Sequence, residues 1–171
     1  MIIFVIIYAF SIIGFFVHLF LSKEERKKKQ LFELFILYQL VVNIGILSLI
    51  SAGALLFTPQ LVADSLGWPT CPFQHELGNV NLAFGVLGIL CIWFRGDFWT
   101  ATIIGASIWL LGDGIGHLYL MYGGDTVAAT GVPATNNWIM LITDFLIPTT
   151  LLLLLFAFKS LNRNDVKADI P

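Results

Sequence analysis

The chain has 171 residues, of which 58% are hydrophobic and only 12% charged, and its mean hydropathy is +0.88. A soluble domain carries about 25% charged residues, so this chain lacks the polar surface that water requires. The net charge of -2 gives no reason to expect a nucleic-acid partner. The composition predicts an all-α polytopic membrane helix bundle, because helices satisfy their own backbone hydrogen bonds in lipid.

Five segments are apolar and long enough to cross a bilayer, which takes about 20 residues. In chain order they cover about residues 1–22, 31–57, 73–94, 98–122 and 137–158. The first has no basic region before its apolar run and no cleavage site after it, so we interpret it as a retained helix rather than a signal peptide. We expect a single transmembrane domain of five helices over residues 1–171.

Basic residues set the orientation of this bundle. With five spans, all nine Lys and Arg residues fall on one side: five in residues 23–29, one at Arg95 and three after residue 158. Basic residues favour the cytoplasmic side. We therefore expect the N-terminus outside and residues 159–171 as a cytoplasmic tail, in a prokaryotic plasma or inner membrane.

Aromatic residues near the ends of the predicted spans indicate where the membrane interfaces lie. Trp68, Tyr122 and Trp138 fall near the outer boundary, and Trp93 and Trp99 near the inner one. Tryptophan and tyrosine are enriched at both interfaces, so we expect all five to anchor the bundle there.

Small residues recur at helical spacing on two neighbouring spans. The third span carries Gly78, Asn81, Gly85 and Gly88, and the fourth carries Gly105, Gly112 and Gly116. Small residues on one stripe let helix backbones approach closely in lipid. We expect the third and fourth helices to pack tightly through these faces, which are also the candidate contacts of a homo-oligomer.

Four ionisable residues fall inside the predicted spans, where charge is costly and is a functional candidate by default. They are Glu76, Asp113, His117 and Asp144, with Asn79 and Asn81 as neutral companions. Helical rise places all four in the outer half of the membrane, at depths of roughly 5–14 Å. Asp113 and His117 share a helix face at i,i+4 spacing. These six residues predict a polar pocket open to the outside.

Several functions fit such a pocket. The first is binding of a lipophilic small molecule (a quinone, an isoprenoid or a lipid), with Asp113 and His117 as the candidates for proton transfer. A proton- or ion-coupled transporter would need a polar route past Asn43 to the cytoplasmic side. In a structural or accessory subunit, Asp113 would pair with His117. No metal site is predicted, because the Glu-x-x-His repeats of di-iron bundles are missing. The cofactor, and whether any reaction occurs, stay open.

Three stretches carry a resemblance to known proteins. Residues 67–85 contain Pro72-Phe-Gln-His-Glu-Leu-Gly78, and Gly112-Asp-Gly-Ile-Gly-His117 and Asp144-Phe-Leu-Ile-Pro148 follow. Together they resemble a family of small uncharacterised prokaryotic membrane proteins over about residues 60–150. The pattern is loosely similar to DoxX-like membrane proteins, compact bundles of about four helices. That resemblance implies a shared bundle core and a link to quinones or sterols, but the fifth helix departs from it.

Overall fold

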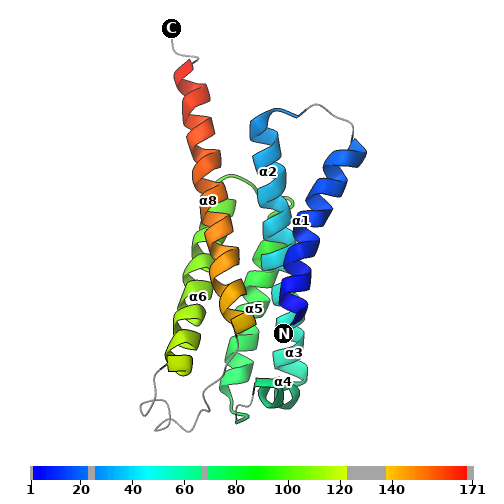
Figure 1. Ribbon diagram of the computed structural model, residues 1–171, viewed down its shortest axis with the longest axis vertical. Coiled ribbons are helices and arrows are strands. Elements are labelled where there is room, and N and C mark those ends of the chain that lie inside the picture. The colour runs from blue at the N-terminus through cyan, green and yellow to red at the C-terminus, as the bar shows by residue number, and fades with distance from the viewer. Residues whose placement is uncertain (1, 23–25, 67–68, 123–137, 169–171) are drawn as a thin grey trace.

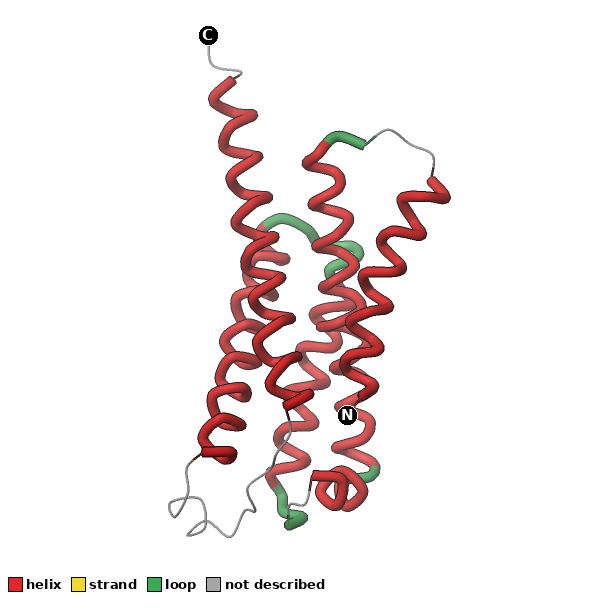
Figure 2. Tube along the Cα trace, viewed as in Figure 1, coloured by secondary structure: helices red, strands yellow, loops and turns green. Residues whose placement is uncertain are grey.

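A computed structural model describes residues 2–22, 26–66, 69–122 and 138–168, and the elements in these ranges are all helices (Figures 1 and 2). The chain begins with α1 (Ile2–Ser22). Three segments then run on without a break: α2 (Lys28–Tyr38), the π-helix η1 (Gln39–Ile46) and α3 (Leu47–Phe57). This second helix starts before the expected residue 31. Its π-helical middle was not anticipated.

The remaining elements differ from the expected segments at their ends. A short helix, α4 (Pro59–Leu66), occupies what was expected to be a loop. Next, α5 (Phe73–Leu90) stops short of residue 94, and the link after it reverses through Gly96 at a φ of 68°. After α6 (Asp97–Tyr122), α8 (Trp138–Ala168) runs well past residue 158. Nothing from 159 to 168 interrupts this helix, because that stretch contains neither glycine nor proline.

The helix ends fall into two groups along the long axis of the bundle. The end of α1, the start of α2, the α5–α6 link and the C-terminal part of α8 lie toward one end, and α4 and the start of α5 toward the other (Figure 1). Arg26, Lys27, Arg95 and Lys159 therefore belong to the same end. Lys23, Trp68 and the expected start of the fifth span at residue 137 lie outside the described residues.

Helix packing contradicts the expected α5–α6 glycine interface. The glycine face of α5 packs on α3 and η1 instead, and α6 packs mainly on α8. A Cβ on Gly88 would overlap the backbone nitrogen of Gly45, and one on Gly85 would stand 2.8 Å from the Leu49 side chain. On α6, a Cβ on Gly105 would lie 3.3 Å from the Phe84 side chain of α5, whereas one on Gly112 would have no atom within 4 Å. The prediction was wrong because a small-residue stripe shows that a neighbour is close without saying which helix it is.

An apolar core fills the bundle between α2, η1, α6 and α8. Its buried members are Ile36, Leu40, Ile44, Leu47, Cys91, Trp99, Ile103, Ala106, Ile147 and Leu151. Trp99, expected at the membrane interface, is only 3% exposed, and its Nε1–H donates to the Cys91 carbonyl over 2.8 Å. Arg95 covers this ring at 5.2 Å. The indole is thus part of the buried core and not an interface anchor, whereas Trp93, Tyr122 and Trp138 are exposed.

Within the described residues, four helical segments are long and apolar enough to cross a membrane. They are Ile3–Ser22, Lys28–Phe57, Asp97–Tyr119 and Leu141–Leu161. Among the described helices, α5 is long but not in this group, since its first turns carry Gln74, His75, Glu76, Asn79 and Asn81. The fold is therefore an all-helical bundle with the character of a multi-pass membrane protein.

Candidate functional site

The bundle joins two of the predicted ionisable residues across α6 and α8. His117 Nδ1 lies 2.9 Å from Asp144 Oδ2, and the two side chains are only 12% and 10% exposed. An ionised carboxylate is an acceptor only, so Nδ1 then carries the hydrogen. A nonlocal pair such as this links the two helices and fixes the imidazole ring.

A glycine makes room for this pair. Gly114 is buried, and a Cβ there would come within 2.9 Å of the Phe145 ring and 3.2 Å of the Asp144 Cβ. The α6 and α8 backbones therefore approach closely beside the pair. This close approach brings the short Asp144 side chain within hydrogen-bonding distance of His117.

Asp113 lies one helical turn from His117 on α6. Its side chain is half-buried, and within the described part of the chain its carboxylate accepts no hydrogen bond. The pairing that sequence suggested, Asp113 with His117, is thus replaced by Asp144 with His117. Asp113 adds a second carboxylate close to the imidazole.

Residues on α5 do not join this pair. Glu76 and Asn79 are exposed, and no hydrogen bond between described residues links them to His117 or Asp144. Asn81 is buried, but its Nδ2 donates to the Leu77 carbonyl of the same helix over 2.9 Å. Of the six residues predicted for the pocket, the structure groups the three on α6 and α8.

One aromatic contact connects α5 to the neighbourhood of Asp113. Phe84 and Trp109 stack with ring centroids 5.1 Å apart and an interplanar angle of 7°. Trp109 lies one turn before Asp113 on α6, so this stack covers α6 beside the carboxylate.

The chemistry of the pair is acid–base chemistry and hydrogen bonding. The described residues contain no group of three or more His, Cys, Asp or Glu side chains arranged to hold a metal ion. A histidine beside a buried carboxylate can accept a proton, because the carboxylate stabilises the imidazolium that forms. The arrangement can therefore donate and accept protons within an apolar bundle.

A second polar cluster lies between α1 and η1 and was only partly foreseen. Gln39 Nε2 and Asn43 Nδ2 both donate to Ser11 Oγ, over 3.0 and 3.1 Å, and Asn43 also donates to Gln39 over 2.7 Å. All three residues are buried. The i,i+4 spacing of Gln39 and Asn43 in an apolar helix was the available signal, whereas the contribution of Ser11 is nonlocal.

The helices and their buried polar contacts define a multi-pass α-helical membrane protein. The chain belongs to a family of unknown function, DUF6790, whose model matches residues 1–164. Comparison with curated proteins finds no match, and neither does comparison with solved structures. The expectation of an uncharacterised family agrees with this assignment.

Proposed function

We propose that this protein binds a lipophilic small molecule whose polar group meets His117, Asp144 and Asp113. The observation that carries the proposal is the 2.9 Å contact between His117 and Asp144 across α6 and α8, with Asp113 one turn away. Quinones, isoprenoid alcohols and related lipids carry one or two hydrogen-bonding groups on an apolar body. A buried acid–base pair in an apolar bundle complements such molecules.

The apolar core favours binding over ion-coupled transport. Toward the Arg95 end of the bundle, the site is followed on α6 by Ala106 and Ile103 and on α8 by Ile147 and Leu151, all buried in one cluster. An ion or proton would have to cross this layer, where an unpaired charge is costly. The polar cluster at Asn43 lies in a different helix interface, between η1 and α1. This arrangement suits a binding site that is closed toward the Arg95 end of the bundle.

The proposal includes a topology of five spans in a prokaryotic plasma membrane, with the N-terminus outside. In this topology α5 is the span that adds to the four apolar ones, and its 18 residues would extend about 27 Å at 1.5 Å per residue, close to the apolar thickness of a bilayer. The shared end of Arg26, Arg95 and Lys159 supports this orientation (Figure 1). A topology reporter fused after Lys159 should show that this position lies on the cytoplasmic side. Activity in the periplasm would refute the orientation.

Ligand binding is tested by removing the pair without removing the packing. In the double variant His117→Leu/Asp144→Leu, two apolar side chains replace a buried pair, an exchange that is often neutral for stability. The control is Asp97→Asn, which neutralises an exposed acidic residue at the other end of α6. Each protein is purified with its surrounding lipid in polymer-bounded discs, and the extracted small molecules are compared by mass spectrometry. Ubiquinone-1 and farnesol are then added back as probes, a quinone first because of the DoxX-like resemblance.

We expect a small molecule enriched with the parent and with Asp97→Asn, and at least tenfold depleted from the double variant. Equal recovery from all three proteins, or no enrichment and no probe binding by the parent, would refute the binding site. Proton flux through the parent in liposomes, absent from the double variant, would instead identify a transporter. A double variant that unfolds while the parent binds nothing would assign the pair a structural role.

A further inference from the structure

A proline interrupts the backbone hydrogen bonding of α8 one turn after Asp144. Pro148 lies inside this helix, and its side chain is fully buried. Proline has no backbone N–H, so the Asp144 carbonyl lacks the donor that residue i+4 supplies in an α-helix. Among the described residues, no side-chain donor is hydrogen-bonded to this carbonyl. Asp144 therefore brings two acceptors to the bundle, its carboxylate and its backbone carbonyl.

The carbonyl that Pro148 leaves without a helical donor lies on the buried face of α8. Asp144 and Pro148 are one turn apart, so they share a helix face, and both are buried. A carbonyl without a donor is costly where water is excluded. In membrane helices with an interior proline, a neighbouring helix, a hydroxyl side chain or an ordered water supplies the missing donor. A molecule bound next to the His117–Asp144 pair is well placed to do the same.

The register between α6 and α8 places Asp113 at the level of this carbonyl. The two helices run antiparallel (Figure 1), and His117 pairs with Asp144. Both helices rise about 1.5 Å per residue, so Asp113, one turn before His117, lies at the level of Pro148, one turn after Asp144. Helix carbonyls point toward the C-terminus, so the Asp144 carbonyl is directed toward that level. Asp113 also interacts electrostatically with both Asp144 and His117, so the three groups lie close together.

The groups gathered at this level are hydrogen-bond acceptors. The ionised carboxylates of Asp113 and Asp144 have no hydrogen to donate, and neither has a backbone carbonyl. In the neutral His117 ring with its hydrogen on Nδ1, Nε2 is an acceptor as well. A ligand that offers only carbonyl oxygens, such as a quinone, would place acceptor against acceptor. A ligand with a hydroxyl group would supply the hydrogen that the Asp144 carbonyl lacks.

We propose that the ligand is a lipophilic molecule with a hydroxyl group, a hydroquinone or an isoprenoid alcohol, that donates a hydrogen bond to the Asp144 backbone carbonyl beside Asp113. Pro148 is a positioning residue for this contact, because it keeps the carbonyl out of the helical hydrogen bonding. This ligand class rests on the binding function proposed above and narrows it to molecules that carry a donor. For a quinone and its quinol, the reduced form is the one that binds.

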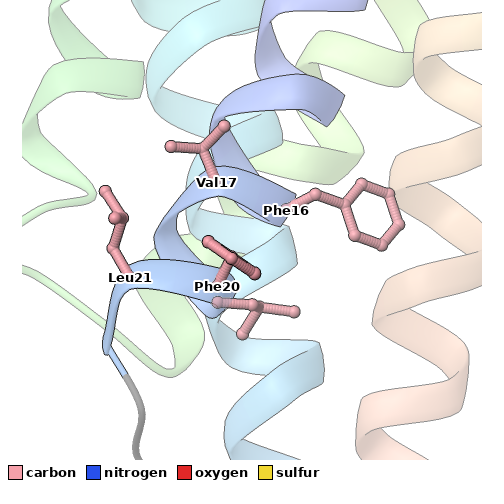
Figure 3. Close-up of a pocket in the computed structure, with 5 residues that line it drawn as sticks. Phe16, Val17, Phe20 and Leu21 are labelled. Carbon is pink, nitrogen blue, oxygen red and sulfur yellow. The ribbon is translucent and has the colours of Figure 1, made fainter.

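A lipophilic probe can also adsorb to the outside of the bundle, and the test has to separate the two modes of binding. On α1, an open depression is lined by the apolar side chains of Phe16, Val17, Leu19, Phe20 and Leu21 (Figure 3). These side chains carry no hydrogen-bonding group, so a molecule held there gains nothing from a hydroxyl over a carbonyl. Two probes of one shape that differ only in this group therefore separate the site at Asp144 from the apolar surface.

Two pairs of probes meet this requirement: ubiquinol-1 with ubiquinone-1, kept anaerobic, and farnesol with farnesal. Affinities are measured by equilibrium binding to the protein in polymer-bounded discs, with protein-free discs of the same lipid as the blank. The variant is Pro148→Ala, which restores the N–H of residue 148 and returns a helical donor to the Asp144 carbonyl. Its control is Ile147→Val, which removes volume from an adjacent residue that is 2% exposed and leaves the backbone donors unchanged.

We expect the parent to bind the hydroxyl member of a pair at least about tenfold more tightly than the carbonyl member, because a hydrogen bond among charged acceptors contributes about that much. Pro148→Ala should reduce this preference about fivefold, the contribution of one hydrogen bond to a neutral carbonyl. Ile147→Val should leave the preference unchanged. A loosened bundle would weaken both members alike, so the ratio of the two affinities reports the hydrogen bond and not the packing.

Equal affinity of the parent for the two members of each pair that it binds would overturn this ligand class and leave the proposed binding function standing. Binding of none of the four probes would overturn both. An unchanged preference in Pro148→Ala would show that the proline does not act through the Asp144 carbonyl. Protection of Cys91, which is fully buried, from a thiol reagent shows that each variant is folded. If Pro148→Ala does not fold, the preference of the parent decides the ligand class by itself.

Discussion

Replacing Gly88 with Ala should destabilise the bundle more than any other single methyl group added to α5. Its Cβ would overlap the Gly45 backbone nitrogen, stand 2.6 Å from the Gly45 Cα and 2.8 Å from the Ile44 carbonyl carbon. Backbone atoms cannot rotate aside as a side chain can. The methyl group therefore forces α5 and η1 apart.

The expected loss follows from two opposing effects. Overpacking costs about 1–3 kcal/mol, and separation of the helices also loosens the contact of Gly85 with Leu49. The higher helix propensity of alanine offsets at most about 1 kcal/mol of this loss in stability. A net loss of about 2 kcal/mol corresponds to a fall in Tm of about 5 °C for a chain of this size. Gly112→Ala is the matched control, because nothing lies within 4 Å of its added Cβ.

The two cysteines provide the assay. Cys71 is exposed and Cys91 is buried, so in a Cys71→Ser background a thiol-reactive fluorophore reports when the core around Cys91 opens on heating. Gly88→Ala should lower the midpoint and Gly112→Ala should leave it unchanged or raise it. A Gly88→Ala midpoint within 1 °C of the parent would refute the close α5–η1 contact. An equal fall of the midpoint in Gly88→Ala and Gly112→Ala would instead favour the α5–α6 glycine interface.

Two further substitutions test contacts of α8. Gly114→Ala should weaken ligand recovery at least threefold, because its methyl meets the Phe145 ring at 2.9 Å and shifts the two helices that hold the pair. Gly116→Ala, which meets nothing within 4 Å, should leave recovery unchanged. Tyr8→Phe removes the 3.0 Å contact with Thr150 Oγ1 and should lower stability by about 0.6 kcal/mol. The same thermal assay checks it, and a loss above about 2 kcal/mol would show that the tyrosine does more than bridge α1 and α8.

Hydropathy located the helices well because lipid accepts only long apolar helical segments. The expected spans at 1–22 and 98–122 closely match α1 and α6. The π-helix η1 escaped prediction, because its sequence, QLVVNIGI, has the composition of an ordinary apolar helix. The sequence also did not reveal which helices pack on one another, because lipid-facing and protein-facing surfaces are equally apolar. The glycines of α5 were recognised as contact residues and assigned to the wrong helix for this reason.

The candidate site was predictable in composition but not in pairing. A carboxylate or imidazole inside a span stands out in any sequence, which is how Asp113, His117 and Asp144 were chosen. Spacing along one helix favoured Asp113 as the partner of His117, because only neighbours in sequence reveal their proximity. The actual hydrogen bond, to Asp144, joins residues on different helices. It depends on the close approach at Gly114, which the sequence does not reveal.

Among the described residues, the buried polar clusters at Ser11 and at His117 differ in chemistry, and this difference bears on function. Ser11, Gln39 and Asn43 join α1 to η1 with neutral groups, and Tyr8 and Thr150 join α1 to α8 in the same way. Neutral contacts connect helices without the cost of burying a charge, which is several kcal/mol for each ion. If holding α6 against α8 were the only requirement, a neutral pair would meet it at a lower cost than a histidine and a carboxylate. The ability to exchange a proton is what the ionisable pair adds, and it is the property that the proposed ligand site would use.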